Sequence, residues 1–406
     1  MCYCLIQMSM IRNLFLKRKV YLDWASAAPV KPEAARAFRR ALGAYGNPSS
    51  PHADGVTAKR ILEEARTTIA RLSAVKAASV IFTSGATEAN ALAIQGRINA
   101  MVAQGKRYED LHILYLPTMH SSALKTIAAL AERGVRTDAI PLKDWRIDLP
   151  AFAKLLCPET ALVCVDAVCG ETGTRFDTRG VRTAIDKVGF CGNALLHVDA
   201  SQLPLAESIE RTRLGADTMA LDAQKVGGVR GIGALIVNDL QSIAPILQGG
   251  GQEQGLRPGT EPVALAAAFA AALTACDAQR DAFARKASQL RAALLATLTG
   301  ALPGMLVNEG SRKDRGAPHI LNLSFPNLDT DYAVMLLDTA GYSVATRSAC
   351  ETDSVEGSTA VRILSGDTLR AQSTLRISWG LETSDCDLQR FAQELIRTVQ
   401  FLQETS

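Results

Sequence analysis

The chain has 406 residues, of which 48% are hydrophobic and 21% are charged, and its formal net charge is +3. This length is enough for one large domain and a smaller second one around a sizeable core. The small charge, without a basic run interleaved with aromatic residues, excludes a nucleic-acid-binding stripe, so we expect no nucleic-acid partner. The nine cysteines are odd in number and irregularly spaced. They therefore exclude a disulfide framework and indicate a reducing compartment, for which we expect the cytoplasm.

Residues 1–18 are predicted to be an extension outside the fold. The mildly apolar run 1–10 is too short to cross a bilayer, so we expect no membrane partner. Its positive cluster, Lys17 to Lys19, follows the apolar run, which is the reverse of the order in a secretory signal. A targeting role for this extension stays open.

From residue 19 to residue 262, short apolar strands alternate with helices. The predicted strands cover residues 20–24, 79–83, 112–116, 135–140, 161–165, 195–198, 218–221 and 233–237. The first predicted helix starts near Pro32, and the others cover residues 55–72, 89–101, 121–133, 149–156 and 181–188. This alternation predicts an α/β domain in which a mostly parallel sheet is flanked by helices on both faces.

The second half of the chain predicts a smaller domain over residues 263–406. A polar, glycine-rich segment, 248–260, closes the first domain, and a long alanine-rich helix over about 263–298 then connects the two. The remainder mixes strands at 320–325 and 375–378 with helices at 332–340 and 386–402, which is typical of an α+β domain.

One lysine lies where such a sheet places its ligands. Lys225 follows an apolar strand and precedes a glycine-rich turn, and Asp199 ends the preceding strand. Burial would lower the pKa of this lysine and make it an amine nucleophile able to form a Schiff base. Pyridoxal phosphate requires such a lysine for its aldehyde and an acid for its pyridine nitrogen. The alternative is a surface lysine in a glycine-rich hairpin.

A phosphate site is also predicted where the turn Ser84 to Glu88 opens a helix, because free N–H groups and the helix dipole favour an anion there. With these motifs in order, the chain resembles the cysteine desulfurases. These are pyridoxal-phosphate enzymes of fold type I in the class-V aminotransferase group. The resemblance runs from about Tyr21 to the last helix and rests on these segments: Tyr21 to Asp23, Gly46 to His52, Thr83 to Glu88, His120, Glu171 to Gly173, Val198 to Gln202, Lys225, Gly231 to Leu235, Arg257 to Thr260, Ser348 to Cys350 and Arg376 to Ser378.

The resemblance implies a role for each residue around the cofactor. Lys225 would form the Schiff base, Asp199 would keep the pyridine nitrogen protonated, and His120 would stack on the ring and move protons. Of the remaining cofactor-binding residues, Ala86, Thr87 and Gln224 would lie at the phosphate, Gln202 at the ring oxygen, and Thr260 at the phosphate of a neighbouring subunit. The last contact implies a homodimer, and no metal site is predicted.

The substrate implied by the resemblance is L-cysteine, held by Arg376 and Asn47. Cys350 lies in a polar segment of more than ten residues, and a thiol exposed there can ionise and attack. Its thiolate would take the sulfur of bound L-cysteine, giving L-alanine and a persulfide. The sulfur would pass to an acceptor protein, either an iron–sulfur scaffold or a thio-modification enzyme. Cys164, Cys169 and Cys191 lie in or near apolar segments and are expected to be buried and unreactive.

Three positions depart from the family pattern. Gly170 stands where the family usually has asparagine, while Asp222 and Gln224 stand where it usually has serine and histidine near the phosphate. An ionised aspartate would repel a phosphate dianion by about 1–4 kcal/mol at close range. Asp222 therefore points away, pairs with Arg347 or Arg230, or weakens cofactor binding. These departures keep alternatives open: another class-V reaction, such as selenocysteine lyase or aminotransferase, or a degenerate homologue that acts as an interaction protein.

Overall fold

The computed structural model describes residues 19–189, 194–311, 316–346 and 357–405. Its largest sheet has seven strands, in the spatial order β2-β10-β9-β8-β7-β3-β4. All neighbours are parallel except β10, which runs antiparallel to both β2 and β9. The strands are β2 (Val80–Thr83), β10 (Gly233–Val237), β9 (Thr218–Asp222), β8 (Leu195–Asp199), β7 (Thr160–Asp166), β3 (His112–Tyr115) and β4 (Arg136–Ala139). The predicted, mostly parallel sheet is confirmed.

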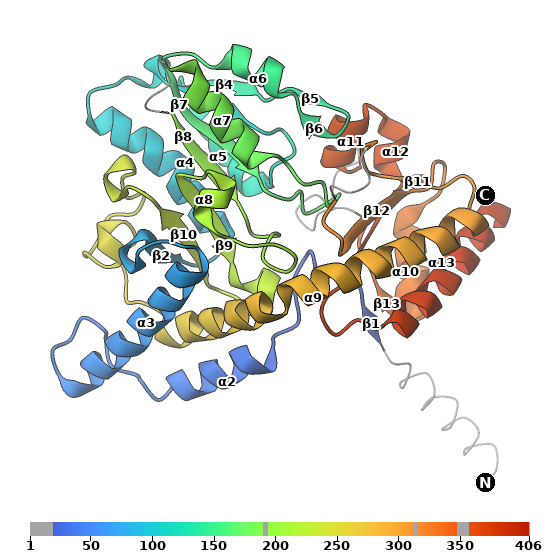
Figure 1. Ribbon diagram of the computed structural model, residues 1–406, viewed down its shortest axis with the longest axis horizontal. Coiled ribbons are helices and arrows are strands. Elements are labelled where there is room, and N and C mark those ends of the chain that lie inside the picture. The colour runs from blue at the N-terminus through green and yellow to red at the C-terminus, as the bar shows by residue number, and fades with distance from the viewer. Residues whose placement is uncertain (1–18, 190–193, 312–315, 347–356, 406) are drawn as a thin grey trace, which may run out of the picture.

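Helices cover both faces of this sheet, and α7 lies in front of it in Figure 1. The helices of this part of the chain are α2 (Pro32–Ala41), α3 (Ala53–Leu72), α4 (Ala86–Ala103), α5 (Ser121–Ala131), α6 (Leu149–Leu155), α7 (Thr178–Val188) and α8 (Arg211–Leu214). Local sequence explains where some of them start. Asp148 and Asp177 cap α6 and α7 by accepting hydrogen bonds from Ala151 N and Gly180 N.

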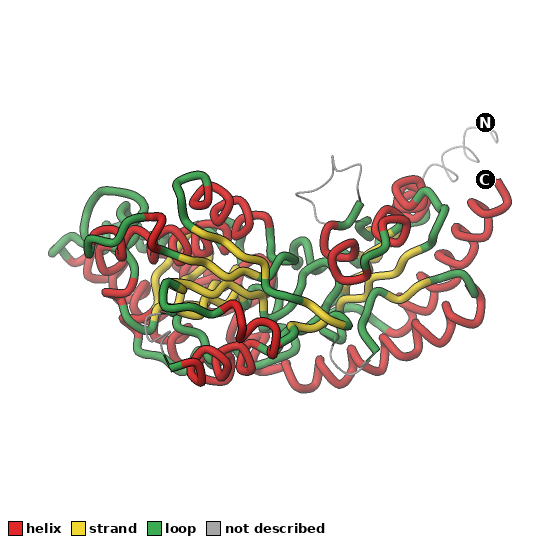
Figure 2. The backbone as a smooth tube through the Cα atoms, turned by 90° about the horizontal axis from the view of Figure 1, so that it is seen from above, coloured by secondary structure: helices red, strands yellow, loops and turns green. Residues whose placement is uncertain are grey.

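The second part of the molecule begins with the long helix α9 (Val263–Ala301), which packs on α2 and α3 and, further along, on α13. A three-stranded sheet, β11 (Leu306–Val307), β12 (Ile320–Ser324) and β14 (Thr374–Ser378), lies beside the large one, and Figure 2 shows the two groups of strands separated along the long axis. The other elements are α10 (Thr330–Thr339), α11 (Thr359–Ser365), α12 (Thr368–Gln372), α13 (Asp385–Thr405) and the strand pairs β1–β13 (Val20–Tyr21 with Tyr342–Ser343) and β5–β6 (Leu142–Lys143 with Arg146–Ile147).

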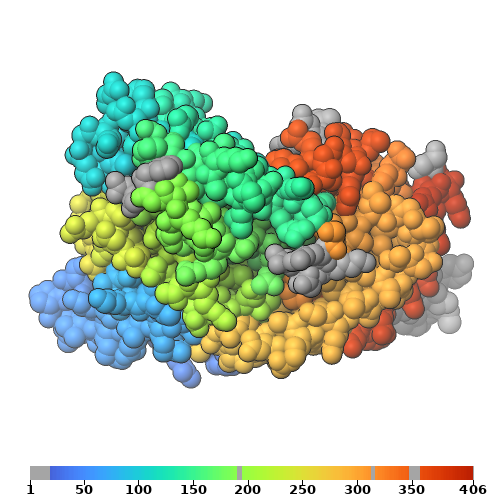
Figure 3. Space-filling view, turned by 45° about the horizontal axis from the view of Figure 1, so that its top comes forward, coloured from blue at the N-terminus to red at the C-terminus, as the bar shows by residue number. Residues whose placement is uncertain are grey.

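The N-terminal strand lies with the second part of the chain although it precedes the large sheet. β1 pairs with β13, and Asp23 bridges to Ser378 at the end of β14. The residues just after it, Ala25 and Ser26, reach the cavity described below. This segment therefore connects the two parts, and the predicted division at residue 262 stays a prediction. Figure 3 shows the surface hollowed where the green residues meet the orange and red ones.

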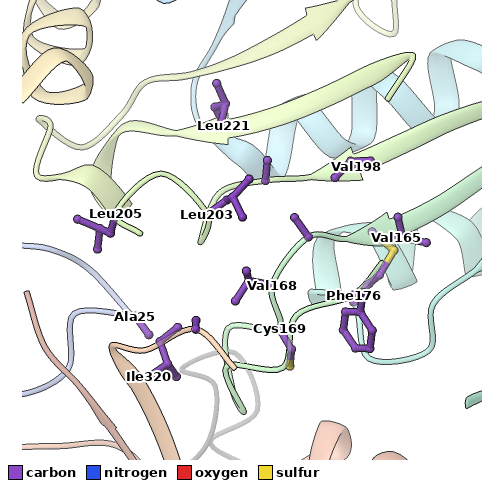
Figure 4. Packing of buried hydrophobic residues seen from close by; sticks show 14 of the residues in the cluster. Ala25, Val165, Val168, Cys169, Phe176, Val198, Leu203, Leu205, Leu221 and Ile320 are labelled. Carbon is purple, nitrogen blue, oxygen red and sulfur yellow. The ribbon is translucent and has the colours of Figure 1, made fainter. Parts of the chain in front are cut away.

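Buried hydrophobic residues fill the space below the carboxyl ends of the central strands. Val165, Val198 and Leu221 come from β7, β8 and β9, and all are at most 1% exposed. Ile320 of the small sheet lies below Val168 in Figure 4, so the core continues between the two parts. The strand ends are held rigidly by this packing. Among the described helices, none combines the length and the apolar composition that crossing a membrane requires.

One buried ion pair connects helix α3 and the glycine-rich segment around residue 253 to β2, an edge strand of the large sheet. Arg66 of α3 and Glu253 are 4% and 5% exposed, and their side chains form two hydrogen bonds of 2.7 Å. The same carboxylate accepts from Phe82 N at 2.7 Å, on β2. The pair thus fixes the glycine-rich segment around residue 253 to the sheet.

We expect Glu253→Ala to lower the free energy of unfolding by about 3 kcal/mol, because it removes the buried carboxylate partner of Arg66, which then keeps only the half-exposed carboxylate of Glu63, and leaves Phe82 N without its acceptor. Denaturant unfolding of the cofactor-free protein measures this. The matched control is Glu64→Ala, which breaks the exposed pair of Arg60 and Glu64 and should cost less than about 1 kcal/mol. Equal losses in the two variants would contradict a special role for the buried pair.

Candidate active site

A cavity of about 320 Å³ opens at the carboxyl ends of β7, β8 and β9. Ligand pockets usually begin at about 300 Å³, so this one is large enough for a small cofactor with its substrate. Eight of the site residues predicted from the sequence line it: Ala86, Thr87, His120, Asp199, Gln202, Gln224, Lys225 and Arg376. The fold thus brings together side chains that are up to 290 positions apart between Ala86 and Arg376.

Lys225 lies in a short 3₁₀ helix, Ala223–Val226, that follows β9 directly. Its Nζ donates hydrogen bonds to Ala25 O at 2.7 Å and Ser26 O at 2.8 Å. Burial lowers the pKa of this ammonium below its ordinary value, and the Asp222 carboxylate only partly offsets the shift. The lysine is therefore positioned and partly desolvated, as an amine nucleophile requires.

Asp199 ends β8 and is 9% exposed. Its Oδ2 accepts from Asn90 Nδ2 at 2.8 Å, and its Oδ1 accepts from Ser201 N at 3.0 Å. On its other side the Asn90 amide contacts His197 Nε2 at 2.9 Å. Burial lowers the pKa of His197 to about 4, so this imidazole is neutral at physiological pH. The two hydrogen bonds fix the orientation of the Asp199 carboxylate at the end of β8.

His120 is the N-cap of α5. Its Nδ1 accepts from Ser122 N at 3.1 Å and lies 2.9 Å from Ser122 Oγ. In the neutral imidazole this arrangement assigns the proton to Nε2. Ser122 Oγ in turn accepts from Asn90 Nδ2 at 3.0 Å, so the histidine and Asp199 are tied to the same asparagine.

Arg376 of β14 is 3% exposed and comes from the small sheet. Its Nη2 donates to Asp23 Oδ1 at 2.7 Å and Ser26 Oγ at 2.6 Å, and its Nη1 donates to Gly170 O at 3.1 Å. Gln202 Nε2 donates to Ala25 O at 2.8 Å. A Cβ added at Gly170 would lie 3.1 Å from Gln202 Nε2, so an asparagine there would press on this amide.

Asp222 answers the question that the sequence left open. Its Oδ2 accepts from Ala86 N at 3.1 Å, at the first residue of α4, and its Oδ1 accepts from Gln224 N at 3.0 Å. The carboxylate thus points into the predicted phosphate site. It makes no ion pair with Arg230 or any other described residue, and Arg347 lies outside the described residues.

Two of the predicted site residues do not line the cavity of this chain. Asn47 Oδ1 accepts from Ser49 N at 2.9 Å, in the loop before α3, and neither Asn47 nor the exposed Thr260 lines the cavity. Their roles stay predictions. Cys350 and Cys191 lie outside the described residues. Cys164 and Cys169 are buried as predicted, and burial raises the pKa of the Cys169 thiol to about 12.

Sequence reasoning missed three polar residues that support the site. Asn90 is fully buried, His197 is fully buried, and Asp166 is 5% exposed in the wall of the cavity. Asp166 is the register partner of Asp199 on the neighbouring parallel strand, so the two side chains share a face. Burial and the charges of Asp199 and Glu171 raise the pKa of Asp166 well above its ordinary value. The available signal was that both strands end in aspartate.

Residues 20–391 match the model of a protein family described as aminotransferase class-V. The chain belongs to this family. It is 33% identical over 376 residues to the cysteine desulfurase IscS of Tolumonas auensis, which covers 91% of this chain and 90% of that protein. It is also 32% identical over 396 residues to a mitosomal cysteine desulfurase of Encephalitozoon cuniculi, covering 96% of this chain and 88% of the relative.

Solved structures give the same fold. A NifS-like protein superposes with a TM-score of 0.86 at 26% identity, covering 95% of this chain and all of that one. DndA of Streptomyces lividans superposes with a TM-score of 0.73 at 30% identity, covering 87% of this chain and 98% of that one. The architecture is therefore pyridoxal-phosphate fold type I, as the resemblance predicted, and the family depends on this cofactor.

The residues present fit pyridoxal phosphate. Three buried polar atoms of cavity-lining residues lack a hydrogen-bond partner within the described part of the chain: Thr118 Oγ1, Ser201 Oγ and Arg376 Nε. Buried polar groups normally have hydrogen-bond partners, and a polar ligand bound in the cavity would supply them for these atoms. Lys225 and Asp199 supply the amine and the acid that the ring requires. The exception is Asp222, whose carboxylate lies at the predicted phosphate site.

We expect borohydride treatment of the holoprotein to fix the cofactor covalently to Lys225, because its amine is desolvated and faces the cavity. Lys225→Ala should lose this adduct and the long-wavelength absorbance of the bound cofactor. Lys286→Ala is the matched control, because its Nζ also donates to a backbone carbonyl, that of Thr383, but it does not line the cavity. Peptide mapping that places the adduct on another lysine would contradict the assignment.

Proposed function

We propose that the protein is a pyridoxal-phosphate-dependent cysteine desulfurase that converts L-cysteine to L-alanine and retains the sulfur as a persulfide on Cys350. One observation carries this proposal: Lys225, with a lowered pKa, shares a cavity with the hydrogen-bonded Asp199 and the buried Arg376. The family membership and the names of the similar proteins support the choice of reaction.

The bound cofactor supplies an electron sink that labilises bonds at the substrate's Cα. Around it, each residue has one task. Asp199, held in place by Asn90 and the Ser201 N–H, would hold a proton on the pyridine nitrogen. Lys225 would hold the aldehyde, and its amine would move protons at the substrate once released.

Arg376 would bind the substrate carboxylate, since a guanidinium suits a planar, charged partner. Asp23, Ser26 and Gly170 fix its orientation from three sides. His120, with Nδ1 engaged by Ser122, would present Nε2 to the cavity as a proton donor or acceptor. Gln202 would contact the ring oxygen of the cofactor.

Cys350 is the proposed sulfur acceptor because the described cysteine at the cavity is unsuited to the task. Cys169 lines the cavity, but burial raises the pKa of its thiol to about 12, so it stays protonated. Cys157 and Cys386 do not line it. A thiolate from the polar segment around residue 350 would attack the sulfur of bound L-cysteine. The new S–S bond would form as the Cβ–S bond breaks, with its electron pair left on the alanine fragment and then protonated.

The alternatives account for less of the site. An aminotransferase would have no use for Cys350, and a degenerate interaction protein would have no reason to keep Lys225, Asp199 and Arg376 in one cavity. For the finer points we propose that the persulfide goes to an iron–sulfur scaffold or a thio-modification enzyme. The fully buried or free cysteines fit the reducing cytoplasm that the composition indicates.

We expect Cys350→Ser to bind cofactor and L-cysteine normally but to form no persulfide and no alanine above about 1% of the wild-type rate, because serine cannot accept sulfur. Mass spectrometry after L-cysteine treatment and an alanine assay measure this. The matched control is Cys386→Ser, which removes an exposed free thiol of α13. Alanine release near the wild-type rate in Cys350→Ser would favour another lyase or an aminotransferase.

We also propose a homodimer in which Thr260 reaches the partner's cofactor phosphate. Large hydrophobic residues are exposed around the loop that carries Asn47: Leu42 is 57%, Tyr45 83% and Val56 57% exposed. Sedimentation should give about twice the chain mass. Tyr45→Glu should shift the equilibrium toward monomer, because formation of the dimer would then bury the charge of the glutamate. Leu369→Glu, on α12, is a matched control at 59% exposure. A stable monomer with full cofactor occupancy would exclude the shared site.

A further inference from the structure

The N-terminus of α4 already holds an anion that belongs to the protein. Asp222 comes from the end of β9, 136 positions away in sequence, and its Oδ2 accepts from Ala86 N at 3.1 Å. Gly85, the residue before the helix, provides no side-chain cap. The carboxylate of Asp222 therefore takes over the position at the helix dipole that an incoming phosphate would use.

Further contacts hold Asp222 in this place. Gln224 donates to it from the backbone N at 3.0 Å and from the side-chain Nε2 at 3.4 Å. Lys225 on the same turn is close enough for Asp222 to act on its pKa. Asp222 is thus anchored by two elements, and a simple rotation into solvent would give up its hydrogen bonds to both.

A second carboxylate lies at the same turn. Glu88 Oε2 accepts from Ser84 N at 2.6 Å, and its Oε1 accepts from Arg257 at 3.0 Å. Burial raises the pKa of Glu88, but the hydrogen bonds from Ser84 and Arg257 outweigh it and keep the carboxyl ionised. Glu88 has its own cation, whereas Asp222 forms no ion pair with a described residue. An anion arriving at Ala86 N would therefore meet a carboxylate that no ion pair with a described residue neutralises.

We propose that Asp222 fills the phosphate subsite until the cofactor binds, and that the cofactor's phosphate binds there together with one proton from solvent, shared between phosphate and carboxylate. This inference rests on the proposed pyridoxal-phosphate function. It makes Asp222 a residue that sets how strongly the protein selects a phosphorylated cofactor and how that selection depends on pH.

The sign of the pH dependence follows from the two groups. A free phosphate monoester loses its second proton near about pH 6, and a free aspartic acid loses its proton near about pH 4. Two like charges brought together hold a shared proton to higher pH than either group alone. Binding thus takes up a proton above about pH 6, and the affinity falls by up to about tenfold per pH unit until the shared proton is lost.

Other charged groups face the same cavity: Lys225, Asp166, Asp199, Glu171, His120 and Arg376. The reaction of the aldehyde with Lys225 depends on pH, and so does the protonation of the cofactor's ring nitrogen, which would lie at Asp199. Pyridoxal without its phosphate reports both of these contributions, including the effect of Asp222 on the pKa of Lys225, but not the contact between phosphate and carboxylate. The difference between pyridoxal phosphate and pyridoxal therefore isolates the phosphate subsite.

The experiment titrates the cofactor-free protein with pyridoxal phosphate and with pyridoxal at about pH 6 and about pH 8, following absorbance and fluorescence. Asp222→Asn keeps an acceptor oxygen for Ala86 N but removes the charge, and Asp222→Ser removes the charge and leaves a shorter hydroxyl that can also donate. The matched control is Asp239→Ser. Asp239 follows β10 and accepts from Gln241 N at 3.0 Å, which is the same local contact away from the cavity.

We expect both Asp222 variants to bind pyridoxal phosphate at least about tenfold more tightly than wild type at about pH 8, with a smaller gain at about pH 6. Their affinity for pyridoxal, and the affinity of Asp239→Ser for both ligands, should stay within about twofold of wild type, since no phosphate–carboxylate contact changes. A gain that is the same at both pH values, or shared by pyridoxal, would overturn the proposal, as would weaker binding of pyridoxal phosphate in Asp222→Asn.

The proposed function fails separately. If neither wild type nor the Asp222 variants give a borohydride-stable adduct at Lys225, the cofactor assignment itself is wrong. If all of them give this adduct and bind pyridoxal phosphate with the same affinity and pH dependence, the cofactor assignment stands and only the role of Asp222 is wrong.

Discussion

Three neighbouring parallel strands end in aspartate. The main constraint on the site is therefore that three carboxyl groups lie close together at the carboxyl ends of these strands. β7, β8 and β9 end at Asp166, Asp199 and Asp222. Like charges that lie close together away from water repel strongly, so carboxyl groups at this place need hydrogen-bond partners or a raised pKa. The chain resolves this in three ways. Asp199 receives hydrogen bonds from Asn90 and Ser201, Asp222 receives those of Ala86 and Gln224, and burial and the neighbouring carboxylates raise the pKa of Asp166 well above its ordinary value.

Helix α4 supplies partners to two of the three. Ala86 and Asn90 are four residues apart, so they lie one above the other on the same face of the helix. That face bonds Asp222 at its first residue and Asp199 one turn later. The distance between the phosphate subsite and the ring-nitrogen subsite is therefore set by one rigid turn. His197, two residues before Asp199 on the same side of β8, fixes the Asn90 amide from below.

The fold, Asp199, Lys225 and the phosphate turn could be predicted because they depend on local signals, whereas the other site residues were predicted from the resemblance to the family. The alternation of apolar strands with helices predicted the sheet, and the position of Asp199 and Lys225 at the ends of strands predicted their place in the site. The start of α4 was predicted at residue 89 rather than Ala86, because its cap comes from Asp222 on another strand. The short elements β11, β13, α11 and α12 were missed, because two to seven residues show no periodicity. Asn90 was missed for a similar reason: its importance depends on Asp199 and His197, far away in the sequence.

The segment Asp23 to Ser26 explains how two parts of the molecule act on one substrate. Ser26 accepts Lys225 Nζ through its backbone oxygen and Arg376 Nη2 through its hydroxyl, so one residue orients both cations. Their proximity matters electrostatically, since burial lowers the pKa of Lys225 and the positive charge of Arg376 adds to that shift. Asp23 balances the arginine with an ion pair of 2.7 Å. The guanidinium is therefore fixed in orientation for a carboxylate, while the lowered pKa of the lysine favours the neutral amine. The same short segment thus orients both the guanidinium and the amine of the site.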